Sequence, residues 1–300
     1  MAVPSPSAAV PPPPGDDSRA ALPDPREVRL LEVLNGYGRV AVAFSGGVDS
    51  SLVAWAAHAA APSAVAVTAV SPSLAEGELD TARAVAAHIG IPHIAIRTEE
   101  FSRPEYVRNA GDRCYHCKTE LYEHLIGLRE RLGVDVVANG ANLDDLGDYR
   151  PGMDAAREHG VRSPLIEAQL TKSDVRDIAR RRGLPVWDKP AAPCLSSRIA
   201  YGVEVTPERV RRIDAAEAFL RSRFGLRELR VRLEANDLAR IEVPLGDLPP
   251  LMAGESPAAI AAEFRGLGFR RVTIDLEGFR SGNLNDALPL TQLTPLAGDR

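Results

Sequence analysis

Lysine is almost missing from this 300-residue sequence: it occurs only at Lys118, Lys172 and Lys189, and arginine supplies the remaining basic side chains. We attribute the shortage mainly to a general bias toward arginine in this sequence, but the three lysines are still worth following as candidate functional residues. Long apolar runs are missing too, because none approaches the roughly 18 to 20 residues that span a bilayer. The N-terminus shows no basic patch followed by an apolar stretch, so no secretory signal is visible. We therefore expect a cytoplasmic protein with no membrane partner.

Cysteine is scarce as well, with three residues, Cys114, Cys117 and Cys194. An odd number of thiols in a cytoplasmic chain argues against a disulfide framework. A formal net charge of −5 argues against a protein that coats nucleic acid, so no nucleic-acid partner is expected. The remaining composition, 45% hydrophobic and 26% charged, is typical of soluble globular proteins, and 300 residues leave room for two domains.

The most informative stretch is the glycine- and serine-rich segment 45–51, Ser-Gly-Gly-Val-Asp-Ser-Ser. It follows the apolar run 40–44 and precedes a helix-compatible segment that begins at Leu52, which is the order strand, turn, helix. Two glycines let the backbone approach an anion closely, and the helix N-terminus adds about half a positive charge. An oxyanion, most simply pyrophosphate, fits such a turn. The candidate binding residues are Ser45, Gly46, Gly47, Asp49, Ser50 and Ser51.

No Gly-Lys-Ser/Thr follows the two glycines, so the segment is not a Walker A loop. It resembles instead the PP-loop of the ATP pyrophosphatase superfamily. That resemblance implies adenylation of a substrate oxygen by ATP, with pyrophosphate leaving into the loop. The alternative is a tight turn that merely happens to be rich in glycine and serine.

Strand and helix patterns alternate through the first part of the chain. This alternation indicates βαβ units, and hence an α/β domain with a parallel sheet and helices on both faces. Ligands of such sheets bind beyond the carboxyl ends of the strands. Segment 45–51 lies there, and so does segment 139–142, which makes Gly140 a further candidate binding residue. The expected strands are 40–44, 65–70, 93–97 and 134–138.

A second unit begins at Thr206 and Pro207, a helix cap followed by a proline at the first helical position. Strand patterns at 229–233, 239–243 and 272–276 predict a smaller α+β domain whose sheet has one apolar and one polar face. A Pro- and Ala-rich N-terminal stretch predicts disorder. The expected division is a disordered tail at 1–27, a PP-loop domain at 28–190, a cysteine-bearing linker at 191–205, a substrate and oligomerisation domain at 206–290, and a tail at 291–300.

The three thiols form the second candidate site. Cys114 and Cys117, in a Cys-x-x-Cys spacing, can reach one metal ion or cluster, and Cys194 would complete three ligands with one position open. His116 as a fourth ligand would instead give a closed, structural Cys3His zinc site. The thiols could also simply pack as small apolar side chains, or have independent roles. Both segments are expected to be irregular, and Cys194 is the best candidate nucleophile or sulfur carrier. Arg198, beside it, is a candidate cofactor-binding residue.

Several motifs occur in one order and together resemble the LarE family of ATP-dependent sulfur transferases, over most of the chain between residues 28 and 290. Family membership implies a role in making the nickel-pincer nucleotide cofactor of lactate racemase and related enzymes. The implied substrate is pyridinium-3,5-biscarboxylic acid mononucleotide, whose carboxylate is adenylated and then converted to a thiocarboxylate. Besides the PP-loop, the motifs are Arg113–Lys118, Gly147–Gly152, Pro193–Gly202 and Gly278–Gly282.

The family resemblance also implies two ways of supplying sulfur. In some members the cysteine that matches Cys194 gives up its own sulfur and becomes dehydroalanine, whereas others hold a [4Fe-4S] cluster on three cysteines. This sequence has all three, so we favour a cluster on Cys114, Cys117 and Cys194. Asp49 is expected to hold Mg²⁺ or to orient phosphate. Lys118, one turn past Cys114, would balance thiolate or adenylate charge, or else is a solvated lysine.

Two arginines on one strand form a third candidate site. Arg230 and Arg232 point to the same side of a strand, roughly 7 Å apart at about 3.3 Å per residue. Such a pair suits a phosphate group, and the LarE resemblance assigns to it the phosphate of the mononucleotide. An ordinary charged sheet face is the alternative. Glu217, within the apolar stripe of its helix, suggests an interface or an ion site shared with Glu242, or a partly exposed edge of that stripe.

We interpret the chain as an enzyme that uses ATP, Mg²⁺ and a [4Fe-4S] cluster to transfer sulfur to a small nucleotide. A tRNA thiolase of the same superfamily is the first alternative, although the chain lacks the extra cysteine pairs of a zinc ribbon. An amidating ligase of the NAD or GMP synthetase kind is the second, and it has no need of three cysteines. A non-catalytic zinc- or nucleotide-binding module is the third. The resemblance further implies a homo-oligomer, namely a hexamer.

Overall fold

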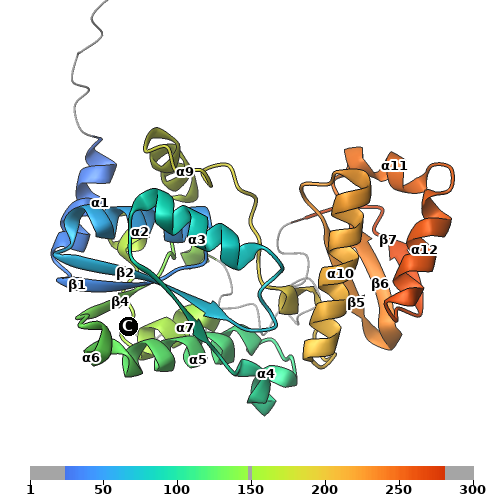
Figure 1. Cartoon of the computed structure of the whole chain (residues 1–300), viewed down its shortest axis with the longest axis horizontal. Coiled ribbons are helices and arrows are strands. Elements are labelled where there is room, and N and C mark those ends of the chain that lie inside the picture. Colours follow the sequence, from blue (N-terminus) through green and yellow to red (C-terminus); the bar gives the residue numbers. More distant parts are fainter. Residues whose placement is uncertain (1–23, 148–150, 281–300) are drawn as a thin grey trace, which may run out of the picture.

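The computed structural model describes residues 24–147 and 151–280, which form a larger α/β body and a smaller domain (Figure 1). The expected disordered tail at 1–27 falls largely outside the described residues, although helix α1 (Pro25–Asn35) already begins within that range. Within the described residues, no helix combines the length and the apolar character needed to cross a membrane. Also outside the description lie the tail at 291–300 and two pieces of motifs, 148–150 and 281–282.

Among the described residues, four parallel strands form the first sheet in the order β3-β2-β1-β4, which confirms the predicted parallel sheet. Val40 and Val42 of β1 pack into one core and Ala41 into another, because successive side chains of a strand point to opposite faces. Both faces are buried, so β1 is apolar at every inner position. The strands are β1 (Arg39–Ala43), β2 (Ser63–Val70), β3 (His93–Arg97) and β4 (Val136–Ala138).

Helices cover both faces of this sheet (Figure 1). Apolar residues of one set of helices pack with Val40 and Val42, and those of a second set pack with Ala41. This three-layer arrangement leaves ligand binding to the loops at the carboxyl ends of the strands. The first set is α1, α2 (Val48–Ala60), α3 (Glu78–Ile89) and α9 (Lys172–Arg181), and the second includes α5 (Arg113–Gly127) and α7 (Pro151–Glu158).

Local sequence signals set the ends of several helices. Thr171 and Asp174 form a capping box at the start of α9, in which each side chain accepts a hydrogen bond from the other residue's backbone N–H. Gly90 ends α3 in the left-handed conformation, with φ of 84°. Short helices connect the longer elements: η1 (Glu100–Ser102), α4 (Pro104–Val107), α6 (Arg129–Leu132), η2 (Leu143–Gly147) and α8 (Pro164–Glu167).

The smaller domain has, within the described part of the chain, a three-stranded sheet in the order β5-β6-β7. β5 and β6 are antiparallel, whereas β6 and β7 are parallel. Helix α10 packs on the apolar face of the sheet, and Thr206 caps it as predicted. The elements are α10 (Pro207–Phe224), β5 (Arg230–Glu234), η4 (Ala235–Asp237), β6 (Leu238–Glu242), η5 (Leu245–Asp247), α11 (Leu248–Met252), α12 (Ser256–Gly266) and β7 (Arg271–Ile274).

The opposite face of this second sheet is charged, as predicted, but both of its candidate arginines are buried. Arg230 is 6% exposed and Arg232 only 1%. Other segments lie over this face: the carbonyl of Ser197 accepts a hydrogen bond from Arg232, and the ring of Phe279 lies against Arg230. Arg230 and Arg232 are therefore shielded from solvent, and their binding of a phosphate stays a prediction.

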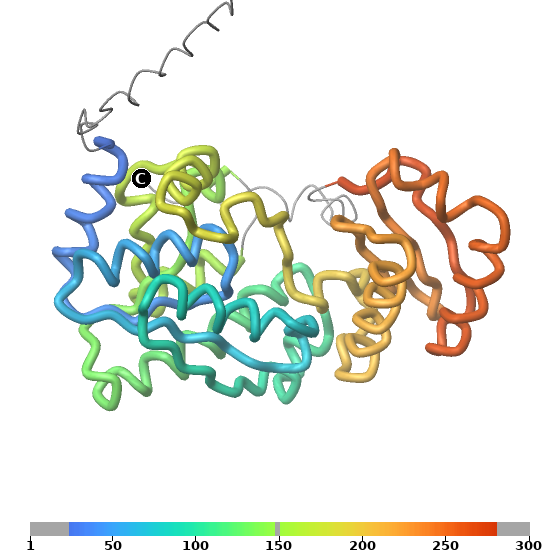
Figure 2. The backbone as a smooth tube through the Cα atoms, turned by 45° about the horizontal axis from the view of Figure 1, so that its top comes forward, coloured from blue at the N-terminus to red at the C-terminus, as the bar shows by residue number. Residues whose placement is uncertain are grey.

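The linker between the domains is held by both of them (Figure 2). Its short helix η3 (Leu195–Arg198) directly follows Cys194. The backbone N–H of Leu195 donates to the carbonyl of Ser73, which follows β2, and Ile199 forms a β-bridge with Leu233 of β5. These contacts fix Cys194 at the carboxyl edge of the first sheet, where the second domain joins it.

Candidate active site

The PP-loop segment 45–51 connects β1 to α2 and is stabilised by its own serines. The hydroxyl of Ser50 lies 3.1 Å from the hydroxyl of Ser45 and donates to the carbonyl of Gly47 at 3.1 Å. Gly46 has φ of 69°, and a Cβ there would lie 2.9 Å from the Cα of Ala82, so only glycine fits. Within the described residues no side chain caps α2, which leaves the N–H groups of its first turn available to an anion.

The loop after β4 lies directly against this segment. A Cβ on Gly140 would come within 2.8 Å of the backbone nitrogen of Ser50, so the contact requires glycine. The side-chain oxygen of Asn139 accepts hydrogen bonds from the Ala141 N–H and the Ser163 hydroxyl, each at 3.0 Å, and these bonds hold the loop in shape. The two segments expected at the carboxyl edge are therefore neighbours, and a binding role for Gly140 stays a prediction.

Asp49, in the first turn of α2, has two partners. Its carboxylate forms an ion pair with Lys172 and accepts a hydrogen bond from the side-chain amide of Asn142 at 3.1 Å. One carboxylate beside an anion-binding turn suits Mg²⁺, which prefers one or two carboxylates together with phosphate oxygens. Sequence reasoning noted Lys172 only as a rare lysine and missed this contact. The signal that could have found it is the capping box, which makes Lys172 the first residue of α9.

The Cys-x-x-Cys segment is helical, which corrects the expectation of an irregular segment. Cys114 and Cys117 lie at the start of α5, and no proline interrupts the helix between residues 113 and 127. His116 points back to Asp112, one turn earlier, with its Nε2 3.1 Å from the carboxylate. His116 is therefore engaged with Asp112, and the closed Cys3His zinc site is not formed among the described residues.

Cys194 is brought near these two thiols from the linker. Burial, followed by the neighbouring thiol of Cys194, raises the pKa of Cys117. Cys114 and Cys194 are exposed, whereas Cys117 is half-buried. Two of the three thiols can thus meet a ligand from solution, and the third lies deeper.

Two cations accompany the thiols. Arg113 is 3% exposed, and although burial acts to lower its pKa, the nearby Cys114 and Cys194 raise the pKa of this residue overall. Lys118 behaves in the same way: desolvation acts to lower its pKa, but Tyr122 and the three thiols raise it. Arg113 and Lys118 therefore place positive charge beside the thiols, where it stabilises negative charge on a bound ligand.

In the part of the chain that the structure describes, no three Cys, His, Asp or Glu side chains stand close enough together to hold a metal ion. The donor set nevertheless fits an iron–sulfur cluster in kind, because such clusters are held by cysteine thiolates. Arg113 and Lys118 would offset part of the negative charge of a cluster. A cluster on Cys114, Cys117 and Cys194 stays a prediction.

Arg198, expected to bind a cofactor, is buried and instead stabilises the Cys194 loop by hydrogen bonds to its backbone. It is 5% exposed and donates to the carbonyls of Pro193, at 2.5 Å, and Cys194, at 3.3 Å. Its Nε donates to Glu217 at 3.0 Å, and Glu217 also accepts from the backbone N–H of Val231 at 3.1 Å. Glu217 is 0% exposed, so the alternative of a partly exposed stripe edge is wrong. It joins α10 to the linker and to β5.

The two arginines of β5 differ in their partners. Arg232 donates two hydrogen bonds to Glu242, each 3.0 Å long, and one to the carbonyl of Ser197 at 2.8 Å. Arg230 has no carboxylate partner among the described residues, and it lies 4.6 Å from the ring centroid of Phe279. Burial, followed by repulsion from Arg232, lowers the pKa of Arg230 to about 10. Because a buried guanidinium needs a partner, Arg230 is available for an anion and Arg232 is already engaged.

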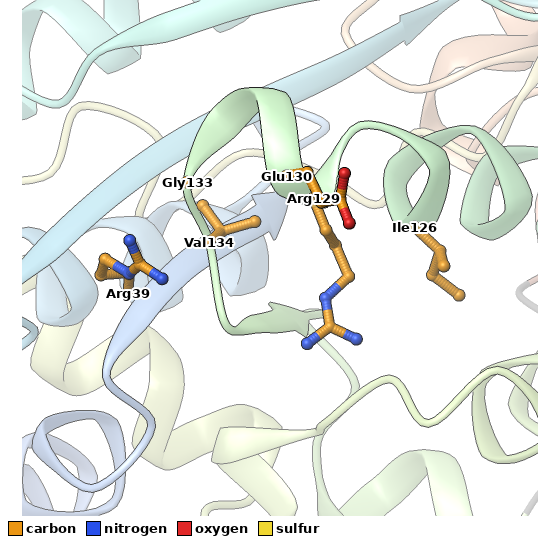
Figure 3. A pocket seen from close by; sticks show the side chains of 6 residues that line it. All are labelled: Arg39, Ile126, Arg129, Glu130, Gly133 and Val134. Atoms are coloured by element: carbon orange, nitrogen blue, oxygen red, sulfur yellow. The ribbon is translucent and has the colours of Figure 1, made fainter.

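A pocket on the α/β body lies apart from these residues (Figure 3). Its lining includes Arg39, which begins β1, and Gly133 and Val134, which precede β4. These are the amino ends of the strands, whereas the PP-loop segment follows the carboxyl end of β1. The pocket of Figure 3 is therefore outside the candidate active site.

Comparison with known proteins agrees with the PP-loop assignment. A family model described as asparagine synthase matches residues 34–117, which include the PP-loop segment and the Cys-x-x-Cys. An uncharacterised protein of Synechocystis is 49% identical over 260 residues, covering 86% of this chain and 96% of that protein.

Two named relatives differ in how much they share with this chain. The pyridinium-3,5-bisthiocarboxylic acid mononucleotide synthase of Lactiplantibacillus plantarum is 36% identical over 274 residues, covering 91% of this chain and 98% of that enzyme. The tRNA-specific 2-thiouridylase MnmA of Azorhizobium caulinodans is 34% identical over 190 residues, covering 51% of this chain and 49% of that enzyme. The first likeness extends through both domains, and the second spans about half of either chain.

Proposed function

Since this chain belongs to the LarE family of ATP-dependent sulfur transferases, we propose that its substrate is pyridinium-3,5-biscarboxylic acid mononucleotide. ATP adenylates a carboxylate of this nucleotide, and sulfur then replaces the adenylate to give a thiocarboxylate on the route to the nickel-pincer nucleotide cofactor. One observation carries the proposal: the PP-loop segment and the Cys194 loop lie at the carboxyl edge of one sheet. The chain that contains them aligns with 98% of the length of a relative named as the synthase of a bisthiocarboxylic acid mononucleotide.

The PP-loop segment would carry the adenylation step. A carboxylate oxygen attacks the α-phosphorus of ATP, the bond from that phosphorus to the bridging oxygen breaks, and pyrophosphate leaves. The N–H groups at the start of α2 receive the pyrophosphate, and Lys172 adds a positive charge beside them. Asp49 would hold Mg²⁺ in place of its ion pair with Lys172, and the ion would supply positive charge to the phosphates. Both changes place positive charge where the leaving group gains negative charge.

The thiol site would supply the second step. A sulfur nucleophile attacks the acyl carbon of the adenylate, the acyl–oxygen bond breaks, and AMP leaves with the electron pair. A [4Fe-4S] cluster held by Cys114, Cys117 and Cys194 would supply that sulfur as sulfide. Lys118 would balance the charge of the adenylate. In the alternative, Cys194 itself attacks; its Cα then loses a proton to solvent as its Cβ–S bond breaks, so that the sulfur leaves with the nucleotide as a thiocarboxylate and dehydroalanine stays in the chain.

Arg230 would bind the phosphate of the mononucleotide. Its guanidinium is buried and has no carboxylate partner among the described residues, so a phosphate would satisfy it. Arg232 would shape this site indirectly, because it holds Glu242 and Ser197. We also propose that the enzyme acts in the cytoplasm as a homo-oligomer and without nucleic acid.

The test combines the purified chain with ATP, Mg²⁺ and the proposed substrate under anaerobic conditions. Pyrophosphate release and the mass of the nucleotide product are followed together. We expect pyrophosphate and a thiocarboxylate. Cys194→Ser should keep pyrophosphate release and lose the thiocarboxylate, because the substitution removes only the sulfur-transfer step. An absence of substrate-dependent pyrophosphate release in the wild-type chain would defeat the proposal.

Two further variants separate the sulfur sources. With a cluster, Cys114→Ser and Cys117→Ser lose iron and thiocarboxylate together, and the chain keeps its mass after turnover. With sacrifice of Cys194, both variants still complete a single turnover, and the chain loses the mass of one H₂S. Iron and acid-labile sulfide are measured before turnover and the chain mass after it.

A further inference from the structure

Asn109 joins the two cysteine-bearing segments of the chain. It is 0% exposed and lies between α4 and α5 in the left-handed conformation, with φ of 55°. Its side-chain amide donates to three carbonyls of the linker, those of Ile199 at 3.3 Å, Ala200 at 2.8 Å and Val203 at 2.8 Å. The linker is the segment that carries Cys194, so one side chain of the α/β body holds the backbone just beyond that thiol.

The other end of the same side chain holds α5. The side-chain oxygen of Asn109 accepts a hydrogen bond from Arg113, the first residue of α5. Arg113 immediately precedes Cys114, and among the described residues it has no carboxylate partner. All the polar atoms of the Asn109 side chain are thus used, with the donors turned to the linker and the acceptor to the helix that carries Cys114 and Cys117.

Neighbouring contacts reinforce this connection. The hydroxyl of Tyr106 lies 2.6 Å from that of Ser196, which is two residues after Cys194. The carbonyl of Asn109 itself accepts a hydrogen bond from the backbone N–H of Gly202 at 3.0 Å. Each of these bonds is buried or shielded, so breaking one leaves an unsatisfied polar group.

We propose that Asn109 is a positioning residue that sets the approach of Cys194 to Cys114 and Cys117. It acts through Arg113 and the linker backbone, and none of these hydrogen bonds joins it to a thiol. The inference rests on the proposed function only in that the three thiols work together. Asparagine suits the position because it tolerates the left-handed conformation and carries both donors and an acceptor on a short side chain.

Disulfide trapping measures this approach directly. The reduced full chain, kept in EDTA, is treated with diamide, which oxidises a pair of nearby thiols to a disulfide. The rate of cross-linking between Cys194 and either thiol of α5 is read by mass spectrometry of peptides. The pair Cys114–Cys117 serves as an internal control, because both residues lie on one helix and their separation does not depend on the linker.

The variant is Asn109→Asp, which keeps an oxygen for Arg113 and loses the donors to the linker. We expect cross-linking of Cys194 to slow by about tenfold or more, because several buried hydrogen bonds are lost at once. The Cys114–Cys117 disulfide should form at the wild-type rate. Asn236→Asp is the matched control: Asn236 is an exposed asparagine with a similar φ of 61°, in the turn between β5 and β6.

Wild-type cross-linking of Cys194 in a folded Asn109→Asp chain would overturn the inference. Should that variant fail to fold by circular dichroism, Asn109→Gly carries the test, since glycine adopts the left-handed conformation without strain. Pyrophosphate release should persist in either variant, because the PP-loop segment is not altered. A wild-type chain that releases no pyrophosphate would defeat the proposed function and leave the cross-linking result standing.

Discussion

The PP-loop segment and the thiol site are built over different distances along the chain. Within the PP-loop segment, the hydrogen bonds between Ser45 and Ser50 join residues that are five positions apart. Around the thiols, the bond between Tyr106 and Ser196 joins residues 90 positions apart. The first site is formed by a short peptide on a parallel sheet, whereas the second exists only when the linker is docked between both domains.

This difference separates what each site needs from the rest of the molecule. A local turn keeps its shape wherever a strand and a helix support it, so a change in the linker should leave adenylation intact. A site assembled from distant segments depends on every contact that positions the linker. Substitutions should therefore divide into those that remove ATP chemistry alone and those that disturb sulfur transfer or stability alone.

The largest expected effect disturbs the PP-loop segment through the loop after β4 that lies against it. In Gly140→Val the Cβ would lie 2.8 Å from the backbone nitrogen of Ser50, so the start of α2 must shift. We expect substrate-dependent pyrophosphate release to fall by more than about 100-fold, as displacements near 1 Å can do in an active site. Gly127→Ala is the control, since a Cβ there meets nothing within 4 Å. A drop in the diamide cross-linking of Cys194 in the valine variant would contradict the independence of the two sites.

The next effect separates the two buried arginines of β5. Arg232→Gln removes one of the two arginines that pair with Glu242, the other being Arg240 at 2.7 Å, and should lower the free energy of unfolding by about 3 kcal/mol, because the oxygen of a buried carboxylate loses its cation. Arg230→Gln removes a buried cation that has no carboxylate partner among the described residues, and it should be neutral or stabilising by about 1 kcal/mol. Urea denaturation of both variants checks the difference. Equal destabilisation would show that Arg230 has a structural partner after all.

A smaller effect concerns a long-range contact of the PP-loop segment. Lys172→Met removes the ion-pair partner of Asp49, and we expect the KM for ATP to rise about tenfold, as loss of a charged hydrogen bond does. Lys189→Met provides the control, because that lysine pairs with Glu78. An unchanged KM would mean that Lys172 serves only to hold α9 against α2.

The smallest effect is a pH dependence of the contact between α1 and α9. Arg26 pairs with Asp24, Asp174 and Asp177, and the hydrogen bond from Arg26 holds the pKa of Asp24 well below its usual range. Because the folded pKa is lowered, the stabilisation is present above about pH 4 and is lost as the pH falls below it. It should amount to no more than about 1 kcal/mol, since Arg26 is a third exposed. Arg26→Met should show a flatter stability profile between pH 5 and pH 3, on the order of that energy.

Much of this arrangement could be predicted from local signals. The strand–turn–helix order around 45–51 and the capping at Thr171 and Thr206 depend on neighbouring residues, and the structure contains all of them. The same holds for the first sheet, because a strand that is buried on both faces must be apolar throughout.

The rest could not be predicted because it depends on distant partners. The start of α5 was expected to be irregular because the segment is polar. The burial of Arg113, which the sequence does not reveal, is part of what holds it as a helix. The burial of Arg232 requires Glu242 and the linker, and the role of Asn109 requires three linker carbonyls. A pattern in one segment carries no information about which other segment will cover it.

The guanidinium of Arg230, which no carboxylate of the described residues neutralises, would make the stability of the fold depend on the nucleotide that we propose binds there. A buried charge without a counterion destabilises the folded chain, and an anion that binds there adds its binding free energy to the stability of the fold. The empty enzyme should therefore be the form that opens more often and is cleaved first by proteases. Supply of the nucleotide would then set the lifetime of the protein as well as its rate of turnover.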